Sequence, residues 1–536
     1  MSKSRKYNQD VNVGQRGAAL VTVILVSLLL GTACIAMLTA VGASSRNNTD
    51  ALSEAKAFYA AESGLQATIN YLRNTPSLTY STALNQQGAG SLPVAGPITI
   101  NSETSYSIQI SDPDLSAGSI VYETAGTFEQ ATAGTYAATR VFGTGADTLT
   151  ISYVPQATTD VVPGVITSFG KFQIVKTGSG PTTLPSALRF RIDYMMSDPR
   201  EGVRTIRGTI ATDGTVTFLT ETGDPQPTYR LMGSTITLCQ SSTFCTSQPV
   251  ISVPPATLAP QTSGTIYGRM TALEPHRLKV VATGIGPGSA RKRLEAIVQR
   301  NFFDDGGSSS AISMIGPNAL FTVGASSQMT IDGGTVPSVT VSDTTGLQTV
   351  LSNHTNGTIE PPPEVAGNDL PDWQQSTTAL DSLIRQLRQT AQNSGRYFNG
   401  TQPTSFGNFE QGTGITFCEG SCTLGGNTEG GGILVVTGTF TTSGNPKFKG
   451  LVLAVGRYVS ASNPGGVVRS GGGNEVFIGN IVIAPYNPDD LMAGFEQPRY
   501  NQSGGPGDTI NSDVDVDVAF NGTSAITNFM LGVAEK

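Results

Sequence analysis

The 536-residue sequence has few charged, aromatic and histidine residues. Charged residues make up 13% of the chain and aromatic residues 7%, and there are two histidines and one tryptophan. The net charge of −8, with no basic cluster interleaved with aromatics after residue 20, argues against nucleic acid as a partner. His276 and His354 have no supporting motif, and the sequence has no P-loop, HExxH or GxSxG. We therefore expect no catalytic residue and no enzyme activity.

Cysteine is also scarce, with five residues in the whole chain. Cys34 lies in an apolar run, and the other four form two close pairs, Cys239 with Cys245 and Cys418 with Cys422. Neither pair is CxxC or is followed by histidine at zinc spacing, so we expect no metal there. Two short-loop disulfides in an oxidising compartment are expected, each stabilising by about 2 kcal/mol; buried free thiols are the alternative.

Glycine and proline are abundant, with 63 and 30 residues. Thr/Ser/Gly-rich tracts alternate with apolar, β-branched runs to the end of the chain, which is not the composition of a disordered protein. The composition and length predict an exported α+β protein that is mainly β, with two to four folding units.

The N-terminal region contains the longest apolar run, "VGQRGAALVTVILVSLLLGTACIAMLTAVGAS". Residues 1–17 carry four basic residues and one acidic residue, and no charge follows until Arg46. A helix over 18–43 is long enough to span a bilayer, and the positive leader predicts export of the remainder.

Three processing outcomes compete for this region. Signal peptidase could cut after Ala43, a lipid could be attached at Cys34, or the chain could be cut after Gly17. An amphipathic helix over 44–74 continues the apolar run without proline, which favours cleavage after Gly17 because a discarded signal peptide needs no such continuation. Its apolar stripe includes Phe58, Leu65, Ile69 and Leu72, with Glu62 among them.

Two motifs in this region, "QRGAALVTVILVSLLL" and "AFYAAESGLQ", resemble the N-terminus of PilX-type minor type IV pilins, which share their architecture with type II secretion pseudopilins. The resemblance implies that 1–17 is a leader removed by prepilin peptidase, and that Ala18 becomes a methylated N-terminus. It implies as partners other pilins and minor pilins, the inner-membrane pilus assembly platform and the inner membrane. The expected location is the bacterial inner membrane, then the periplasm or a cell-surface pilus.

The resemblance also assigns filament contacts to the helix. Type IV pilins usually carry Glu at the fifth mature position, where this sequence has Thr22, and an unpaired terminal ammonium in an apolar filament core is costly. A tip or assembly-priming position is therefore expected. Glu62 either bonds the backbone of the globular body or contacts another subunit. The expected helix contacts are Thr22, Phe58, Glu62, Leu65, Ile69 and Leu72.

The body of the chain falls into two regions. Residues 75–300 contain short alternating runs and an Asp213-Gly214 turn, which predict antiparallel hairpins in one domain or two. Residues 301–536 are Gly-rich, and the 18-residue step from Ile433 to Leu451 is typical of a β-solenoid; a 30-residue step follows, so we expect a short, irregular one. A helix over about 372–394 is inserted there, with Trp373 as a packing anchor.

An acidic sequence, "NSDVDVDVAFNG", is the one candidate metal site. On a strand, Asp513, Asp515 and Asp517 would share one face, which is either a wet surface or a Ca²⁺ site. We expect no other cofactor. The sequence as a whole predicts a minor pilin or pseudopilin-like component with an adhesive surface. The alternative is a secreted or surface-anchored β-solenoid carbohydrate-active enzyme.

Overall fold

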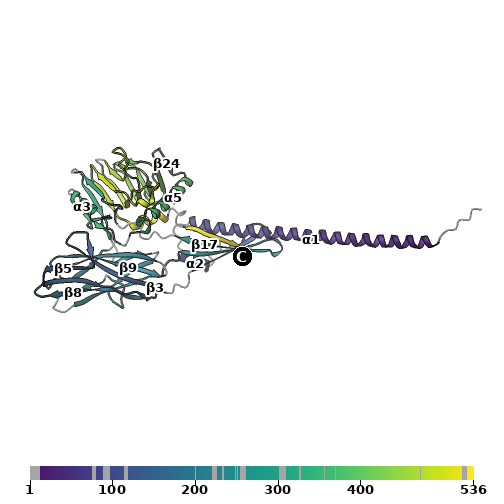
Figure 1. The fold of residues 1–536 in the computed structure, drawn as a ribbon, viewed down its shortest axis with the longest axis horizontal. Coiled ribbons are helices and arrows are strands. Elements are labelled where there is room, and N and C mark those ends of the chain that lie inside the picture. The colour runs from purple at the N-terminus through teal and green to yellow at the C-terminus, as the bar shows by residue number, and fades with distance from the viewer. Residues whose placement is uncertain are drawn as a thin grey trace, which may run out of the picture.

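The computed structural model describes residues 13–535, apart from 75–79, 89–96, 114–118, 199–200, 220–225, 232–233, 248, 250, 254–260, 301–309, 325–326, 355–356, 368–369, 471–472 and 522–527. The fold is α+β and mainly β, as predicted. Figure 1 shows a long helical rod that joins a small sheet, with two larger β domains beyond the inner end of the rod.

The rod is helix α1 (Val13–Asn74), and its second half packs on an antiparallel sheet that we call the platform sheet. The order of this sheet is β1-β2-β16-β17-β34. Its core combines apolar residues of α1, of helix α2 (Tyr80–Gly88) and of one face of the sheet. The strands are β1 (Ile98–Thr99), β2 (Ser105–Ser111), β16 (Arg277–Ile285), β17 (Arg291–Arg300) and β34 (Asn528–Glu535), with the short helix η1 (Pro287–Ser289) between β16 and β17.

The platform sheet is built from distant parts of the chain. Strand β34 pairs antiparallel with β17, so that Ala296 lies opposite Val533. One β domain is therefore inserted between β2 and β16, and the other between β17 and β34. Residues 528–535, which the sequence analysis placed in the C-terminal domain, belong to the platform sheet, and residues 75–300 contribute to two folding units.

The first insertion, the sandwich domain, packs two antiparallel sheets around an aromatic core. The antiparallel pairing predicted for this region is confirmed. One sheet contains β3 (Ile120–Glu129), β4 (Tyr136–Ala137), β7 (Thr159–Val161), β9 (Leu188–Asp198), β10 (Gly202–Ile210), β11 (Thr215–Phe218) and β14 (Ile251–Ser252). The other contains β5 (Thr139–Thr144), β6 (Asp147–Val154), β8 (Ile166–Thr177), β12 (Thr228–Leu231), β13 (Ser234–Cys239) and β15 (Gln261–Met270).

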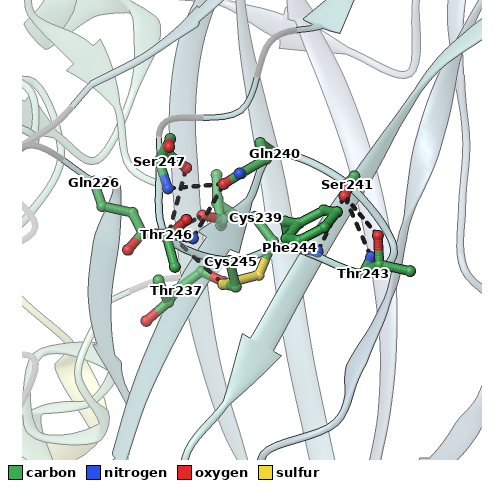
Figure 2. Close-up of a disulfide and its surroundings, with 11 residues drawn as sticks. Gln226, Thr237, Cys239, Gln240, Ser241, Thr243, Phe244, Cys245, Thr246 and Ser247 are labelled. Atoms are coloured by element: carbon green, nitrogen blue, oxygen red, sulfur yellow. Dashed lines mark hydrogen bonds between the residues drawn. A yellow bond between two sulfur atoms is a disulfide. The ribbon is translucent and has the colours of Figure 1, made fainter.

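Two local features of the sandwich domain follow the sequence. The Asp213-Gly214 turn joins β10 to β11, and Gly214 has a φ of 87°, which favours glycine. A disulfide joins Cys239 at the end of β13 to Cys245 in the following loop (Figure 2). This predicted disulfide is confirmed.

The second insertion, the solenoid domain, is made of parallel strands in two sheets. Ile415 pairs with Ile433, and Ile433 pairs with Leu451, so the 18-residue step is one turn of the solenoid. Leu451 then pairs with Asn480, which confirms the longer, irregular turn. The larger sheet contains β18 (Ile312–Met314), β20 (Met329–Asp332), β21 (Val339–Val341), β22 (Thr358–Glu360), β23 (Glu364–Val365), β24 (Tyr397–Asn399), β25 (Ile415–Glu419), β27 (Glu429–Val436), β29 (Lys447–Ala454), β31 (Glu475–Ile483) and β33 (Gly507–Ile510).

The solenoid is not wound in chain order. Strand β18 pairs with β31, and β20 pairs with β33, so the first turn stacks on the last one. The chain then begins again at β24, at the opposite end of the larger sheet. The second sheet contains β19 (Leu320–Val323), β26 (Cys422–Gly426), β28 (Phe440–Gly444), β30 (Val467–Arg469) and β32 (Arg499–Gln502).

Helices cover the larger sheet of the solenoid. On strand β29, Val452 and Ala454 face the core between the two sheets, whereas Leu451 and Leu453 face a layer of helices. This is why such strands read as continuous apolar runs in the sequence. The helices of this layer are α4 (Asp372–Gln375), α5 (Thr377–Asn393) and α6 (Asp513–Asn521), with the short η2 (Leu491–Ala493). Helix α3 (Thr344–Asn353) packs instead on the core between the two sheets. The predicted helix over 372–394 is α4 with α5, and Trp373 is buried beneath it.

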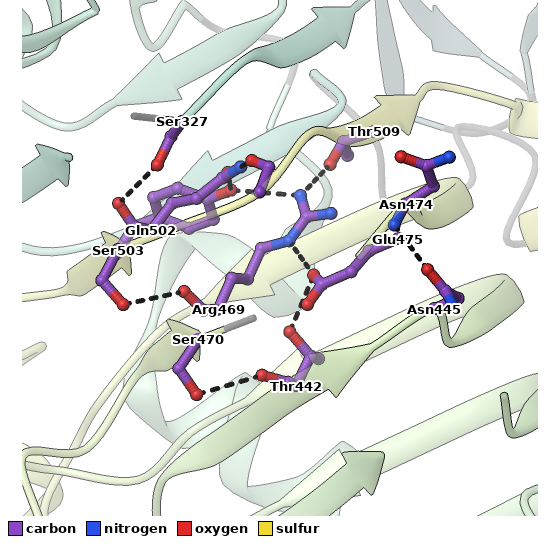
Figure 3. Close-up of polar contacts among 12 residues, drawn as sticks. Ser327, Thr442, Asn445, Arg469, Ser470, Asn474, Glu475, Gln502, Ser503 and Thr509 are labelled. Atoms are coloured by element: carbon purple, nitrogen blue, oxygen red, sulfur yellow. Dashed lines mark hydrogen bonds and ion pairs between the residues drawn. The ribbon is translucent and has the colours of Figure 1, made fainter. Parts of the chain in front are cut away.

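A buried ion pair lies inside the solenoid (Figure 3). The Nε of Arg469 donates to Glu475 at 2.6 Å, and its Nη1 donates to Tyr500 at 3.2 Å and Thr509 at 3.0 Å. Thr442 donates to the same carboxylate at 2.8 Å. These residues come from three successive turns, so the pair links the turns and fixes how they stack.

The two inserted domains touch through a buried carboxylate. Glu364, from β23 at one end of the solenoid, accepts a hydrogen bond from Tyr136 and lies 3.6 Å from Arg191 and 3.5 Å from Arg207 of the sandwich domain. The N–H of Val365 also donates to the carbonyl oxygen of Gly134. Burial, and then the charge of Glu364, raise the pKa of Tyr136 well above its ordinary value. The sandwich domain thus covers the strand edge that would otherwise end the solenoid.

Candidate filament interface

The first half of α1 is an exposed apolar rod. From Leu20 to Leu52 every residue is exposed, although mean hydropathy reaches 2.6 over an 18-residue window. By length and composition, one helix among the described residues could cross a membrane. A membrane anchor and a signal sequence both have this character. Gly17 and Ala18, the predicted cleavage site, lie inside this helix.

The few polar side chains of the rod bond to its own backbone. Ser27 donates to the carbonyl oxygen of Val23 at 2.7 Å, Thr32 donates to that of Leu29 at 2.9 Å, and Thr39 to that of Ala36 at 2.9 Å. Hydroxyl groups satisfied in this way remove most of the penalty of placing them in an apolar phase. The rod is therefore compatible with lipid and with packing against other apolar helices.

The second half of α1 approaches the platform sheet very closely. A Cβ atom on Gly284 of β16 would lie 1.9 Å from the carbonyl oxygen of Ala57, and one on Gly286 would lie 2.5 Å from that of Ser53. On the helix side, a Cβ on Gly64 would lie 2.5 Å from the ring of Tyr106. Glycine is required at these positions because any larger residue would push the helix away from the sheet.

Ion pairs fasten the edges of this helix–sheet contact. Lys56 of α1 lies 2.8 Å from Glu103, and Lys292 of β17 lies 3.3 Å from Glu54 and 3.2 Å from Glu535. The hydrogen bond and charge of Lys56 lower the pKa of Glu103, and hydrogen bonds to the two carboxylates raise the pKa of Lys292. Lys292 thereby connects the helix, the platform sheet and the last strand of the chain.

The predicted filament contacts separate into two groups. Leu65, Ile69 and Leu72 are buried against the platform sheet of the same chain, so they are intramolecular contacts and are not available to another subunit. Phe58 is half-buried at the border of this core. Thr22 is on the exposed rod. The sequence analysis missed Ala57, Ala61 and Thr68, which complete the buried face, because small residues give little contrast in hydropathy.

Glu62 does not bond the backbone of the globular body, which was one of the two roles that the sequence left open. Its side chain is exposed, and no hydrogen bond or ion pair holds it within the described part of the chain. It flanks an outward face that carries two large apolar side chains, Leu52 at 58% exposure and Tyr59 at 65%. Their seven-residue spacing places them on one face of the helix, and this spacing was the signal that could have found them.

The acidic segment that the sequence analysis named as a candidate Ca²⁺ site is helical. "DVDVDV" forms helix α6 and no strand, because Val516, Ala519 and Phe520 pack at helical spacing on the solenoid. Asp515 instead pairs with Lys449 at 3.0 Å, and Asp517 is buried. Asp515 is two positions from both Asp513 and Asp517 on this helix, so the three do not line one face together, and the described part of the chain has no group of three or more His, Cys, Asp or Glu side chains that could hold a metal ion.

The second predicted disulfide is absent. Cys418 and Cys422 are buried free thiols on β25 and β26, and both belong to the solenoid core. A hydrogen bond with Cys418, together with burial, raises the pKa of the Cys422 thiol. His354 ends α3, where its Nδ1 lies 3.1 Å from the carbonyl oxygen of Val350.

No protein-family model matches the chain, and neither a curated protein nor a solved structure matches it.

Proposed function

We propose that the chain is a minor pilin or pseudopilin-like structural subunit of a type IV pilus or a type II secretion pseudopilus. It resembles PilX-type proteins in "QRGAALVTVILVSLLL" and "AFYAAESGLQ". Its partners would be other pilins, prepilin peptidase, the inner-membrane assembly platform and the inner membrane. It acts by assembly and contact. It would reside in the bacterial inner membrane and then in the periplasm or on a cell-surface pilus.

The single observation that carries the proposal is the continuity of α1. One unbroken helix has an apolar first half that contacts nothing in the described chain, and a second half that forms the core of the platform sheet. Apolar surface on this scale is stable only in lipid or against other apolar helices. A helix fixed rigidly to a folded body is suited to leave a membrane and enter a bundle of similar helices.

A position at the filament tip is supported by two features. Thr22 stands where a repeating pilin usually has Glu, so the compensating charge for a neighbouring N-terminal ammonium is missing. The sandwich and solenoid domains also extend beyond the inner end of α1 (Figure 1). Domains in this place obstruct a further subunit that would stack on this one.

The test is the N-terminus of the mature protein isolated from cells. Mass spectrometry should find a methylated Ala18, whereas ordinary secretion would give Ser44 and an uncleaved anchor would give Met1. A Gly17→Leu variant should accumulate as precursor and should not co-purify with other pilins. A start at Ser44 would contradict the proposal, because the rod would then be discarded. Loss of pili or loss of secretion on deletion distinguishes the two assemblies.

A further inference from the structure

The disulfide of the sandwich domain closes a short loop that presents an exposed aromatic ring. Cys239 is 1% exposed at the end of β13, and Cys245 lies six residues further along the chain. Between them, the ring of Phe244 is 63% exposed. Figure 2 shows this ring beside the disulfide, and we call residues 239–247 the disulfide loop.

Hydrogen bonds hold the disulfide loop in one shape. The Oγ of Ser241 accepts from the N–H of Thr243 at 3.3 Å and from that of Phe244 at 3.1 Å. The side-chain oxygen of Gln240 accepts from the N–H of Thr246 at 3.1 Å and from that of Ser247 at 2.7 Å. The ring is therefore carried by a backbone fixed at both ends, so little conformational entropy remains to be lost when it binds something.

Gln226, just before β12, supports the base of the loop. The side-chain amide of Gln226 donates to the carbonyl oxygen of Leu238 at 3.1 Å, and it lies 3.6 Å from the Sγ of Cys245. Single exposed apolar side chains are common on proteins and need no function. Phe244 differs from such residues because a disulfide and several hydrogen bonds fix the loop that carries it. These contacts hold the ring in place without burying it.

The surroundings of the ring are polar and uncharged. Residues 240–247 read "QSSTFCTS" and contain no charged side chain and no second large apolar one. Ser242, Thr246 and Ser247 are exposed, and in the described part of the chain their hydroxyls make no hydrogen bond. An apolar ring carried by a loop of uncharged, hydroxyl-bearing residues suits a pyranose, whose C–H face is apolar and whose rim carries hydroxyls.

We propose that the disulfide loop is a binding site for neutral polysaccharide, with a sugar ring stacked on Phe244 and the hydroxyls of the polymer bonded to uncharged polar groups of the loop. The absence of charge in the loop favours a neutral polymer over an acidic one. A protein partner would need a wider apolar surface than one ring supplies. This inference rests on the proposed function, since it names what the exported head would adhere to.

The experiment uses the full-length protein in detergent, and beads carrying mannan, dextran or galactan, with alginate beads as the acidic comparison. We expect wild type to be retained on at least one neutral polysaccharide and to pass through alginate. Phe244→Ala should weaken retention at least about tenfold, as for the loss of a central aromatic anchor, while Phe244→Tyr should keep it.

The matched control is Tyr458→Ala, which removes an aromatic side chain of 49% exposure from the solenoid domain and should leave retention unchanged. Thermal unfolding of Phe244→Ala should equal that of wild type, because the ring is not part of the core. Equal retention of wild type and Phe244→Ala would overturn the proposal, as would wild type that binds none of the neutral beads or binds alginate equally. The assay needs no filament, so its result is separate from the identity of the mature N-terminus.

Discussion

The sandwich and solenoid domains have hydrophobic cores of different composition. The sandwich core is aromatic: Phe172 lies 6.1 Å from Phe128, 5.9 Å from Tyr153 and 5.0 Å from Phe190, measured between ring centroids. The solenoid core is largely aliphatic and stacked, but it contains the fully buried pair of Arg469 and Glu475. Large rings suit two sheets that pack once, whereas a stack of similar turns needs a polar contact that specifies the order of its turns.

Unfolding of the two domains can be followed separately in one molecule, because the only tryptophan of the sequence lies in the solenoid domain. Trp373 is 8% exposed in the helical layer of the solenoid, so its fluorescence follows unfolding of that domain. Near-ultraviolet circular dichroism of the clustered tyrosines and phenylalanines follows the sandwich domain. The four predictions below use these two signals, and they run from the largest expected effect to the smallest.

Arg469→Met should destabilise the solenoid domain by about 5 kcal/mol, because it leaves the buried carboxylate of Glu475 without its cation. The tryptophan transition should move to lower denaturant while the tyrosine signal stays in place. Adding Glu475→Leu to the same chain should restore much of the loss, since a buried ion pair replaced by apolar residues is often neutral. An unchanged tryptophan midpoint in the single variant would contradict a structural role for the pair.

Phe172→Ala should destabilise the sandwich domain by about 4 kcal/mol, through lost burial and the cavity left among its ring neighbours. Here the tyrosine signal should shift and the tryptophan midpoint should not. Phe172→Leu is the conservative control and should lose less, because it fills part of the cavity. A joint shift of both signals would show that the contact at Glu364 makes the two domains unfold as one unit.

Replacing Cys239 and Cys245 together by alanine should lower the stability of the sandwich domain by about 2 kcal/mol, as expected for a short closed loop. A reductant should have the same effect on wild type and none on the solenoid domain. Alkylation of the unfolded protein without reductant should label Cys418 and Cys422 but not the disulfide pair. Unlabelled Cys418 and Cys422 would show that the protein isolated from cells contains a second disulfide.

The effect of Asp213→Asn should be the smallest and should appear in the pH dependence of the sandwich transition. A hydrogen bond from the N–H of Thr215 lowers the pKa of Asp213 below its ordinary value of 3.8. A carboxyl group with a lowered folded-state pKa stabilises above its unfolded pKa, and this contribution is lost as the pH falls through the folded-state pKa. The stability of wild type should therefore drop more below pH 3.8 than that of the variant, with no difference in the solenoid signal.

Local patterns in the sequence predicted individual helices and strands. The order in which the strands join the sheets depends on pairing between distant segments. The step from Ile433 to Leu451 predicted the solenoid, and the spacing of Leu380, Ile384 and Leu387 predicted α5. In contrast, the stacking of β18 on β31 and of β34 on β17 joins segments more than 150 residues apart, which no local pattern encodes. Alternation in "DVDVDV" was misleading because burial of Val516, Ala519 and Phe520 against the solenoid overrides it.

The sequence predicted that the candidate interface on α1 is apolar. It did not predict which faces of the helix are buried and which are exposed. An apolar run followed by an amphipathic one predicted the rod and its junction with the body. The sequence could not show that Leu65 and Ile69 face inward while Leu52 and Tyr59 face outward, because several rows of α1 are apolar enough to be buried. Which row is buried depends on Gly64, Gly284 and Gly286, where the close approach of the sheet fixes the rotation of the helix.

The return of β34 to the platform sheet makes this sheet depend on the solenoid domain that precedes β34. Strand β17 gains its second neighbour only when residues 528–535, which follow the solenoid domain in the chain, have been synthesised. A chain that stops early, or whose solenoid domain does not fold, leaves β17 with an open hydrogen-bonding edge and Lys292 without Glu535. The platform sheet under the second half of α1 is therefore completed only after the solenoid domain has been synthesised, so the order of the chain couples the two parts of the molecule.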